Sequence, residues 1–305
     1  MTTVDALPVT LDEKRIIARD VVELTLRGVE GALPTWVPGA HIDLQLPNWL
    51  RRQYSLCGDP ADSDVYRIAV GRERLSRGGS EYIHDYLTSG RVLEISAPRV
   101  TFSLKDASRY LFIAGGIGIT PILPMVRAAG HLASVVYAGR SRSRMAYLSE
   151  LASAAADVRI YPEDEIGRPD LSAIAEEFDG IADIYCCGPE PLLSAIEAAF
   201  DGRSNAIHVE RFRPKPRTFA PNTAFQVECL RSGERLEVAE SDSVLDVLAR
   251  NGMGVVGGCR EGVCGTCRLR VVDGQPEHRD EINDDAQYFY PCVSRSFSQT
   301  LVVDV

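Results

Sequence analysis

Four cysteines near the end of the chain constrain its fold more than any other feature. Cys259, Cys264 and Cys267 are spaced C-x4-C-x2-C within one short stretch, and Cys292 follows later in the sequence. This is the plant-type spacing of the ligands of a [2Fe–2S] cluster, which is held by four thiolates. The spacing therefore predicts that these four residues bind the cluster and that the protein transfers single electrons.

The stretch that carries the first three cysteines is rich in glycine. We expect its glycines to let the backbone curl around the sulfur atoms through their freedom in φ; they are Gly257, Gly258, Gly262 and Gly265. A structural zinc site is the alternative. Zinc sites usually draw their ligands from two separated close pairs, whereas three of the ligands here share one loop. The pattern therefore favours a cluster over zinc.

The composition limits what the rest of the chain can be. Its 305 residues are enough for two or three domains, and its net charge of −10 argues against a nucleic-acid-binding protein. No apolar run approaches the roughly 18 residues of a membrane span, and the first residues lack the pattern of a secretory signal. With four of the eight cysteines assigned to a cluster, we expect a reduced, cytoplasmic protein, and a monomer.

The first hundred residues predict β structure. Apolar and polar residues alternate over at least part of three segments, 21–26, 41–46 and 65–70, and turn residues separate these segments. Short strands at such a spacing are typical of a closed antiparallel barrel. One helix, from about Ser80 to Leu87, is expected to interrupt the strands.

Two motifs in this region suggest a binding site. One is Arg52-Gln53-Tyr54-Ser55. The other, Arg77-Gly78-Gly79-Ser80, precedes the expected helix, where Ser80 as N-cap would leave N–H groups free for an anion and Arg77 would add positive charge. Each motif also has an ordinary explanation, because the first is short and Gly-Gly-Ser before a helix is often only a cap.

The pattern changes in the second hundred residues. Tyr110–Ala114 is a continuous apolar run, which is typical of a buried parallel strand. The glycine turn Gly115–Gly118 follows, and Thr120 and Pro121 are the expected N-cap and first residue of a helix. A strand, a glycine turn and a helix in this order can bring the backbone close to a pyrophosphate, although the spacing is not G-x-G-x-x-G.

Further strand–helix units follow and predict an open, doubly wound α/β domain. The expected strands are 135–137, 159–161 and 183–187, and the expected helices are 145–154, 171–178 and 191–200. The ligand of such a domain should lie at the carboxyl ends of the strands, near Gly115–Thr120 and Cys187–Pro189. After the second strand stand residues that could hold a 2′-phosphate or could simply be solvated: Arg140, Ser141, Arg142 and Arg144.

The last third of the chain begins with a linker. A strand is expected at 207–212, and Arg213–Pro221 then has three prolines in nine residues, which predicts a stiff, extended segment. Beyond it, Phe225–Cys229 has the pattern of a strand, and Cys229 is expected in the core. Ser243 with Asp246 resembles a capping box that opens a helix over 244–250.

The order of these regions resembles the phthalate dioxygenase reductase family over nearly the whole chain. The family's motifs stand here in its order: Arg52-Gln53-Tyr54-Ser55, Arg77-Gly78-Gly79-Ser80, Gly115-Gly116-Ile117-Gly118-Ile119-Thr120-Pro121, Cys187-Gly188-Pro189 and the four cysteines. The resemblance implies a multidomain fold with an antiparallel β-barrel flavin domain, an α/β doubly wound nicotinamide domain and an α+β plant-type ferredoxin domain. We place these domains at 1–105, 106–212 and 222–305, with the linker at 213–221.

The resemblance also implies the cofactors and their contacts. It implies that the flavin is FMN rather than FAD and that NADH is the usual donor. NADPH is the alternative donor, because the arginines after the second strand could hold its 2′-phosphate. The implied flavin contacts are Arg52, Tyr54 and Ser55 for the ring and phosphate, and Arg77, Gly79 and Ser80 for the phosphate. The implied nicotinamide contacts are Gly115, Gly116, Gly118, Cys187, Gly188 and Pro189, with Thr120 close to the isoalloxazine. Arg140 and Ser141 are the expected contacts of a 2′-phosphate.

Phe212 is implied to act in catalysis beside Thr120 and Cys187. By the resemblance, its ring stacks on the flavin face where the nicotinamide must lie, and is displaced when the nicotinamide arrives. The alternative is a core phenylalanine that anchors the last strand of its domain.

These features together predict an NAD(P)H-dependent oxidoreductase. Electrons would pass through FMN and a [2Fe–2S] cluster to a separate oxygenase, either a Rieske dioxygenase or demethylase or a haem-thiolate monooxygenase. One alternative is a stand-alone NAD(P)H flavin reductase or oxidase that uses oxygen as acceptor. The other is a non-redox binding module in which the cysteines hold structural zinc.

Overall fold

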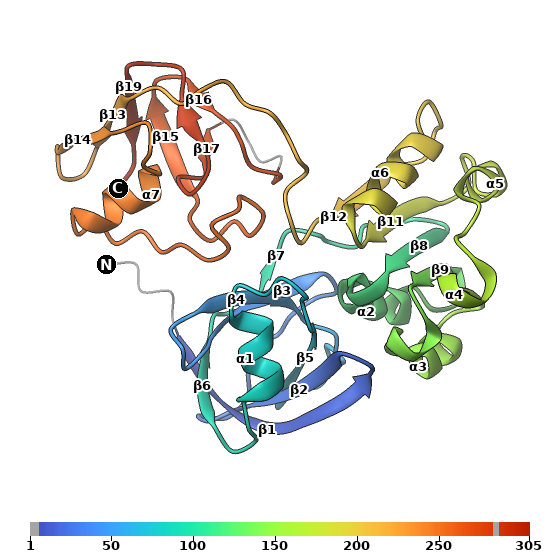
Figure 1. Ribbon diagram of the computed structural model, residues 1–305. Coiled ribbons are helices and arrows are strands. Elements are labelled where there is room, and N and C mark those ends of the chain that lie inside the picture. The colour runs from blue at the N-terminus through green and yellow to red at the C-terminus, as the bar shows by residue number, and fades with distance from the viewer. Residues whose placement is uncertain (1–5, 283–286) are drawn as a thin grey trace. The chain divides into compact units, whose positions relative to one another are not determined.

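The computed structural model describes residues 6–282 and 287–305. The chain forms two compact units, of which the first is Ala6–Arg211 and the second runs from Phe212 to Val305. In Figure 1 the first unit is coloured from blue to yellow and the second from orange to red. Among the described helices, none has the length and apolar character needed to cross a bilayer.

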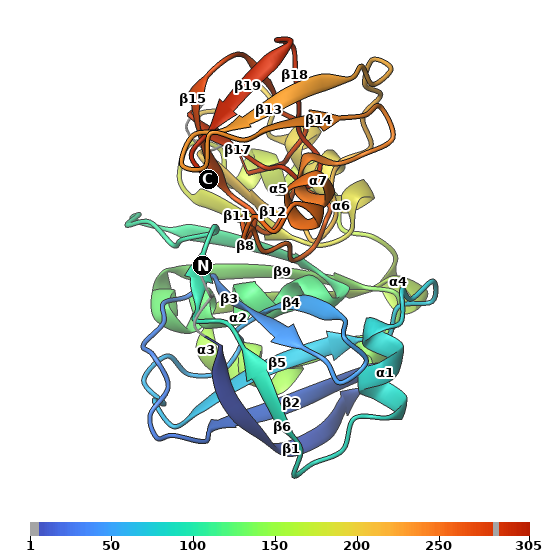
Figure 2. The ribbon, with the colours of Figure 1, turned by 90° about the vertical axis from the view of Figure 1, so that its left-hand side faces the viewer.

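The first unit begins with an antiparallel β-barrel. Its strands are β1 (Leu7–Ala18), β2 (Val21–Gly28), β3 (Ala40–Gln45), β4 (Arg51–Ser55), β5 (Val65–Gly71), β6 (Val92–Ile95) and β7 (Arg99–Val100), with helix α1 (Gly79–Asp85) after β5. The order is β4-β3-β6-β1-β2-β5, with β7 beside β3. A bridge between Leu56, just after β4, and Ile68 of β5 joins the two ends of the sheet. Figure 2 shows the strands around the barrel with α1 at its side.

Alternation along the strands explains the barrel. Val22, Leu24 and Leu26 are every second residue of β2, and all three are buried in the barrel core. The alternation of apolar and polar residues does not identify β1, the first strand, from the sequence. Its pairing with β2 shifts in register between Leu11 and Glu13 and again between Ile16 and Ala18. Such bulges break the two-residue period on which the sequence argument depends.

A five-stranded parallel sheet completes the first unit. Its strands are β8 (Tyr110–Gly115), β9 (Ala133–Gly139), β10 (Asp157–Pro162), β11 (Asp183–Cys187) and β12 (Ile207–Glu210), in the order β10-β9-β8-β11-β12. The helices are α2 (Ile119–Ala129), α3 (Leu148–Ala154), α4 (Glu163–Ile166), α5 (Leu171–Glu177) and α6 (Glu190–Ala199), with short 3-10 turns η1 (Gly116–Gly118), η2 (Gly130–Leu132) and η3 (Arg142–Arg144).

Both faces of this sheet are covered, as a doubly wound fold requires. Phe112 and Ala114 of β8 pack in one hydrophobic cluster with residues of α2 and α3, whereas Leu111 and Ile113 pack in another with residues of α5 and α6. β8 is therefore buried along its whole length, which is why its sequence is a continuous apolar run rather than an alternating one.

The barrel and the parallel sheet share a core. Val21, Cys57, Ala69 and Phe102 belong to the barrel region, and they lie in the same cluster as the residues of α2 and α3. Polar contacts reinforce this packing, since the Tyr147 hydroxyl donates to Glu23 Oε2 at 2.8 Å and Arg127 Nη1 donates to Cys57 O at 3.1 Å. The two predicted domains therefore fold as one compact unit.

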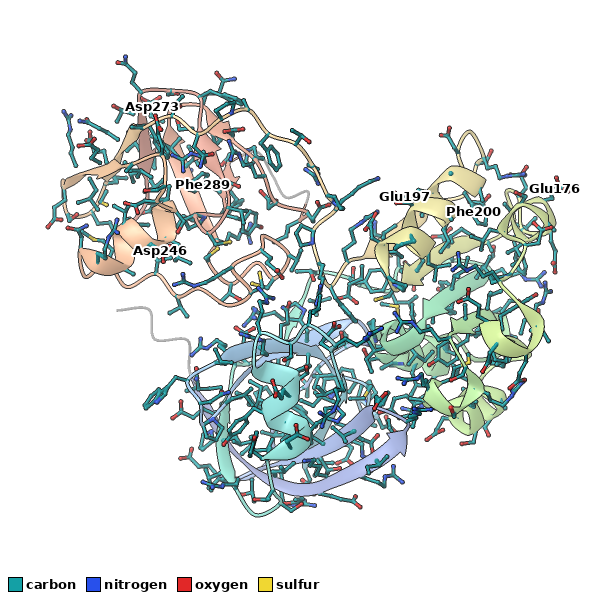
Figure 3. The ribbon with its side chains drawn as sticks, viewed as in Figure 1. Glu176, Glu197, Phe200, Asp246, Asp273 and Phe289 are labelled. Atoms are coloured by element: carbon teal, nitrogen blue, oxygen red, sulfur yellow. The ribbon has the colours of Figure 1, made fainter. Side chains whose placement is uncertain are left out.

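The second unit is an α+β domain. Its main sheet has the order β14-β13-β19-β15-β17, and β16 pairs with β18 in a separate two-stranded sheet. The bounds are β13 (Phe225–Cys229), β14 (Arg235–Val238), α7 (Val244–Arg250), β15 (Leu269–Asp273), β16 (Pro276–Glu277), β17 (Tyr288–Phe289), β18 (Arg295–Ser296) and β19 (Thr300–Val303). Leu248 of α7, Phe289 of β17 and Cys229 of β13 are buried in one core, and Phe289 and Asp246 are labelled in Figure 3. The expectation that Cys229 is a core residue is confirmed.

Several predicted boundaries were wrong for local reasons. The first helix begins at Gly79, because its N-cap is Gly78 in the left-handed region at φ 85° and not Ser80. The helix after the glycine turn begins at Ile119, because the turn itself winds into a 3-10 helix and so shifts the start; Thr120 is not its N-cap. The strand expected at 207–212 ends at Glu210. The capping box at Ser243 is confirmed, since Asp246 N–H donates to Ser243 Oγ at 3.1 Å.

Candidate functional site

The four predicted cluster ligands come together in the second unit. Interactions between side chains join Cys259 to Cys264 and to Cys292, and join Cys292 to Cys267. The structure therefore brings the four predicted ligands into one connected group, as the plant-type spacing of a [2Fe–2S] cluster requires.

Hydrogen bonds to the sulfur atoms also fit a cluster. Glu261 N–H donates to Cys259 Sγ at 3.3 Å, Cys259 N–H donates to Cys264 Sγ at 3.4 Å, and the Thr266 hydroxyl donates to the same sulfur at 3.2 Å. Donors of this kind stabilise thiolates and tune the reduction potential of an iron–sulfur cluster. Thr266 is a participant that the spacing of the cysteines did not reveal.

The glycines of this loop act in two different ways. Gly262 and Gly265 have left-handed φ values of 72° and 73°, as expected. Gly258 does not, and it is needed for close approach instead: a Cβ there would lie 2.8 Å from Thr266 Oγ1 and 3.2 Å from Cys264 Sγ. Gly257 likewise leaves room for Leu245, so the expectation of φ freedom was wrong for these two residues.

The two arginine motifs of the barrel meet at one place. Arg52 Nη2 donates to Arg77 O at 2.9 Å, which joins β4 to the loop before α1. A Cβ on Gly79 would lie 2.8 Å from both Cγ and Nε of Arg52, so only glycine lets the Arg52 side chain lie along the start of the helix. Two arginines beside a glycine backbone can bind a phosphate group. Ser80 is drawn into the same loop, since its hydroxyl donates to Ser76 Oγ and accepts from Glu73 N–H, both at 3.2 Å.

Tyr54 and Ser55 lie on opposite faces of β4, because neighbouring residues of a strand alternate. Burial raises the pKa of Tyr54 well above its usual range, so its hydroxyl stays protonated. On the Ser55 face, the buried atoms His41 Nε2 and Gln53 Nε2 have no hydrogen-bond partner within the described residues. Burial, with the charge of Arg99, lowers the pKa of His41 to about 3, so its ring is neutral. Unpaired polar nitrogens of this kind fit a ring rich in carbonyl oxygens and nitrogens, such as isoalloxazine.

His41 and Gln53 were missed from the sequence. The signal that could have found them is the alternation of polar residues along a buried strand, since His41 and Asp43 of β3 are both 2% exposed. A buried polar residue needs a partner or a ligand.

The carboxyl ends of β8 and β11 meet at glycines, as predicted. A Cβ on Gly118 would lie 2.3 Å from Cys187 O, and one on Gly115 would lie 2.7 Å from Pro189 Cδ. The two segments therefore touch backbone to backbone, with Gly188 between them. Gly116 has a left-handed φ of 54°, and its carbonyl accepts a hydrogen bond from the Tyr137 hydroxyl at 3.1 Å. The structure thus brings together the residues that the sequence assigned to the nicotinamide path.

Cys187 has a neighbour that the sequence did not indicate. Glu210, the last residue of β12, lies beside Cys187 of β11 in the parallel register. Burial raises the pKa of Glu210 to about 8, and its Oε2 atom has no partner within the described residues. Burial, with the nearby Glu210 carboxyl, raises the pKa of Cys187 well above its usual range. The Cys187 thiol is therefore protonated and is not poised as a nucleophile.

Thr120 is almost fully buried, and its hydroxyl donates to Ile117 O at 3.0 Å. Ile117 in turn contacts the barrel, where a Cβ on Gly71 would lie 3.6 Å from its side chain. The glycine turn thus lies at the junction of the barrel and the parallel sheet. Closeness of Thr120 to an isoalloxazine ring stays a prediction.

The four residues after β9 differ in what they contact. Arg142 pairs with Glu165 at 2.8 Å, and Arg144 pairs with Asp20 of the barrel. Ser141 Oγ lies 3.2 Å from Ser143 Oγ. Arg140 is exposed and makes no ion pair with the described residues. Contact of Arg140 and Ser141 with a 2′-phosphate stays a prediction.

Phe212 lies after the end of β12 and begins the second unit. It is 39% exposed, so the alternative in which it is a core residue of the last strand was wrong. Its predicted place on the flavin face stays a prediction.

Known proteins resemble this chain over its whole length. Residues 227–296 match the family described as 2Fe-2S iron-sulfur cluster binding domain. A toluene-4-sulfonate monooxygenase system reductase subunit of Comamonas testosteroni is 37% identical over 317 residues, which cover 98% of this chain and 99% of that protein.

Two solved structures are similar in fold. Phthalate dioxygenase reductase, described as a modular structure for electron transfer from pyridine nucleotides to [2Fe–2S], has a TM-score of 0.71 and 32% identity, covering 99% of this chain and 98% of that one. An intact type IV self-sufficient cytochrome P450 monooxygenase has a TM-score of 0.89 and 38% identity over 98% of this chain, which spans 41% of that longer chain.

The similar proteins and the fold of this chain point to the same family. The predicted barrel, doubly wound sheet and ferredoxin fold are confirmed. The expected cofactors, which are FMN, a [2Fe–2S] cluster and a nicotinamide nucleotide, are confirmed as well, and so is the assignment as an oxidoreductase. The chain therefore belongs to the phthalate dioxygenase reductase family, the flavin- and [2Fe–2S]-containing reductases of oxygenase systems.

Proposed function

We propose that this protein is the reductase component of an oxygenase system, and that the residues described above hold its cofactors. FMN, when bound, takes a hydride from NAD(P)H, and the [2Fe–2S] cluster carries single electrons onward. The observation that carries the proposal is that Cys292 joins the three thiols of the glycine loop in one connected group, with three hydrogen-bond donors to their sulfur atoms in place. Cys259, Cys264, Cys267 and Cys292 are the ligands.

The residues of the first unit bind and orient. Arg52 and Arg77, with Gly79 beneath the Arg52 side chain, hold the flavin phosphate, and Ser80 orders the loop around it. Ser55 contacts the ring from the face of β4 that also carries Gln53, and Tyr54, on the opposite face, contacts the flavin beside Arg52. The nicotinamide enters where β8 and β11 end, along Gly115, Gly116, Gly118, Gly188 and Pro189.

Cys187 and Glu210 shape the inner end of that path. Both are uncharged at neutral pH, because burial raises the pKa of Glu210 to about 8 and the pKa of the Cys187 thiol well above its usual range. A neutral thiol and a neutral carboxyl group keep the site poorly hydrated without repelling the nicotinamide. Thr120 packs nearby, and Phe212 covers the flavin face until the nicotinamide displaces it.

We propose that NADH is the usual donor and that NADPH can also bind if Arg140 and Ser141 contact its 2′-phosphate. Arg140 and Ser141 remain available for a 2′-phosphate after Arg142 and Arg144 have paired with Glu165 and Asp20. Comparing kcat/KM for NADH and NADPH in the wild type and in Arg140→Ala tests this. If the ratio of kcat/KM for NADPH to that for NADH is the same in the wild type and in Arg140→Ala, Arg140 does not contact the 2′-phosphate.

The electron acceptor is a separate oxygenase component, of the Rieske or haem-thiolate class. The relatives support this, because one is named as a reductase subunit of a monooxygenase system and one solved homologue is joined to a cytochrome P450. We further propose a cytoplasmic monomer that binds no nucleic acid, since its eight cysteines are free thiols and its net charge is −10. Cell fractionation tests the location, and sedimentation of the purified protein tests the monomer.

Replacing the fourth ligand tests the cluster assignment. Cys292→Ala should lose the cluster signal in electron paramagnetic resonance but keep the flavin, because the cysteines lie in a different compact unit from the barrel. NADH should still bleach the flavin, while electron delivery to an oxygenase stops. Cys229→Ala is the matched control, since Cys229 is a buried cysteine of the same unit that packs in a different hydrophobic cluster from Cys267 and Cys292. A normal cluster signal in Cys292→Ala would sink the assignment.

A flavin reductase or oxidase is the second candidate. It would consume oxygen at the same rate whether or not an oxygenase is present, and its turnover would not depend on Cys292. Oxygen uptake by wild type and Cys292→Ala, measured with and without an oxygenase component, separates the two functions.

A further inference from the structure

The chain segment that joins the two compact units is anchored at its start. Arg211, the last residue of the first unit, pairs with Glu190 at 2.9 Å and with Glu197 at 2.6 Å. Both carboxylates lie on α6, and Glu197 is labelled in Figure 3. Only 12% of the Arg211 side chain is exposed, so these are well-formed charge-assisted hydrogen bonds.

The segment is anchored again a few residues later, at Glu281 in the second unit. The Glu281 carboxylate accepts the backbone N–H of Lys215 at 3.1 Å and pairs with Arg217 at 2.6 Å. The Glu281 side chain is 11% exposed. A carboxylate that is largely withdrawn from solvent and has two partners holds the segment more firmly than an exposed ion pair would.

Glu281 also contacts the loop that carries the cluster ligands. Its backbone N–H donates to Gly262 O at 3.0 Å, and Gly262 lies between Cys259 and Cys264. A Cβ on Gly262 would lie 3.0 Å from Asp280 Cα, so the two backbones touch. Glu281 therefore ties the joining segment directly to the cluster loop.

Asp280, the neighbour of Glu281, contacts the part of the chain that carries the fourth ligand. The buried Asp280 accepts a hydrogen bond from the Ser294 hydroxyl at 3.2 Å, two residues beyond Cys292. Arg217 donates to Asp280 O at 3.4 Å as well. The contact between the joining segment and Asp280–Glu281 is thus continuous with both parts of the chain that hold the cluster.

The chain segment between the two anchored residues is short. Only residues 212–214 lie between Arg211 and Lys215, and one of them is Pro214. A step of four residues spans at most about 14 Å. While both anchors hold, Lys215, whose N–H the Glu281 carboxylate accepts, stays within that reach of Arg211, the residue that follows Glu210 at the end of β12, whatever arrangement the two units adopt. The rate of electron tunnelling falls exponentially with distance, so such a limit bears directly on the rate.

We propose that Glu281 is a positioning residue: it clamps the joining segment to the cluster loop and so limits the distance over which electrons cross from the flavin to the cluster. The inference rests on the proposed electron-transfer function. It adds a residue that touches neither cofactor and whose effect is on transfer between them.

Stopped-flow spectroscopy of the full-length, cofactor-loaded protein tests the clamp. Glu281→Gln keeps the size of the side chain and an acceptor for Lys215 N–H but removes the charge that pairs with Arg217. Losing a charge-assisted contact shifts an equilibrium by roughly 10- to 150-fold, so we expect the cluster to be reduced about tenfold more slowly or worse. Flavin reduction by NADH and the cluster resonance signal should be unchanged.

Two further variants sharpen the result. Arg217→Ala should slow cluster reduction as well, and the double variant with Glu281→Gln should be no slower than the single ones, because both remove the same contact. Arg231→Ala is the matched control, since it breaks an exposed ion pair with Asp304 in the same unit. It should transfer electrons like the wild type.

Limited proteolysis gives a readout that is independent of electron transfer. Arg213 and Lys215 each precede a proline, so Arg217–Thr218 is the bond within residues 212–221 that trypsin can cut. Cleavage there should be slow in the wild type and several-fold faster in Glu281→Gln.

The possible outcomes separate cleanly. Unchanged rates of cluster reduction and of cleavage in Glu281→Gln would overturn the clamp. Loss of the cluster signal in that variant would show that Glu281 maintains the cluster loop, which also overturns it. A wild-type protein without a cluster signal would instead refute the proposed function, and the inference with it.

Discussion

Gly118→Ala is the change whose effect the structure specifies most directly. Gly118 has φ −61° and ψ −6°, so alanine can adopt its backbone conformation without strain. At the start of a helix, alanine should even stabilise the folded protein by about 0.4–1 kcal/mol, because it lowers the conformational entropy of the unfolded chain. Any loss must therefore come from the added methyl group.

That methyl group has no room. Its carbon would lie 2.3 Å from Cys187 O, 2.5 Å from Cys187 C and 2.8 Å from Gly188 N. These are backbone atoms at the end of β11, which is paired with β8 along its length, so they cannot turn aside as a side chain could. Overpacking of this kind costs about 1–3 kcal/mol. The net loss should be about 1–2 kcal/mol, with the ends of β8 and β11 pushed apart.

Melting and nicotinamide kinetics measure the two consequences. For a unit of this size, the midpoint should fall by about 2–8 °C, and the KM for NADH should rise because the path between the strands is distorted. Gly71→Ala is the matched control: its methyl group would meet Ile117 of the same turn at 3.6 Å, an ordinary contact. A Gly118→Ala protein with the midpoint and KM of the wild type would refute the close-approach argument.

Three other substitutions test the first unit. Arg52→Ala should weaken FMN binding by roughly 10- to 150-fold, equivalent to about 1.5–3 kcal/mol, and Arg52→Lys should restore little because lysine lacks the planar fork; equal affinities in a fluorescence titration would contradict this. Phe212→Ala should raise oxygen uptake and change NADH affinity with little change in melting temperature, since the ring is 39% exposed; a much lower melting temperature with unchanged flavin reduction would count against a cover. Burial raises the pKa of Glu210 from 4.5 to about 8, so the folded protein binds a proton that the unfolded chain releases, and stability falls as the pH rises between these values. Glu210→Gln should remove that fall, and parallel melting curves of wild type and variant against pH would show that Glu210 is not the group.

Much of the site was predictable because its signals are local. The spacing of Cys259, Cys264 and Cys267 identified the cluster loop, since three ligands within nine residues must curl around one centre. The apolar run of β8 followed by Gly115–Gly118 identified the nicotinamide turn in the same way. The errors at Ser80 and Thr120 were also local: a left-handed Gly78 and a 3-10 turn moved each N-cap by two residues, which composition does not reveal.

The sequence by itself determined the class of each region and the chemistry of the cluster, because periodicity and ligand spacing depend on neighbours along the chain. Only the tertiary structure decided which residues meet across it. It paired Arg144, after β9 of the parallel sheet, with Asp20 of the barrel, 124 residues away. It set Glu210 beside Cys187 through the register of β11 and β12, and Lys215 beside Glu281 through the packing of the second unit. Such contacts follow from which faces are buried together, and burial is a property of the folded chain as a whole.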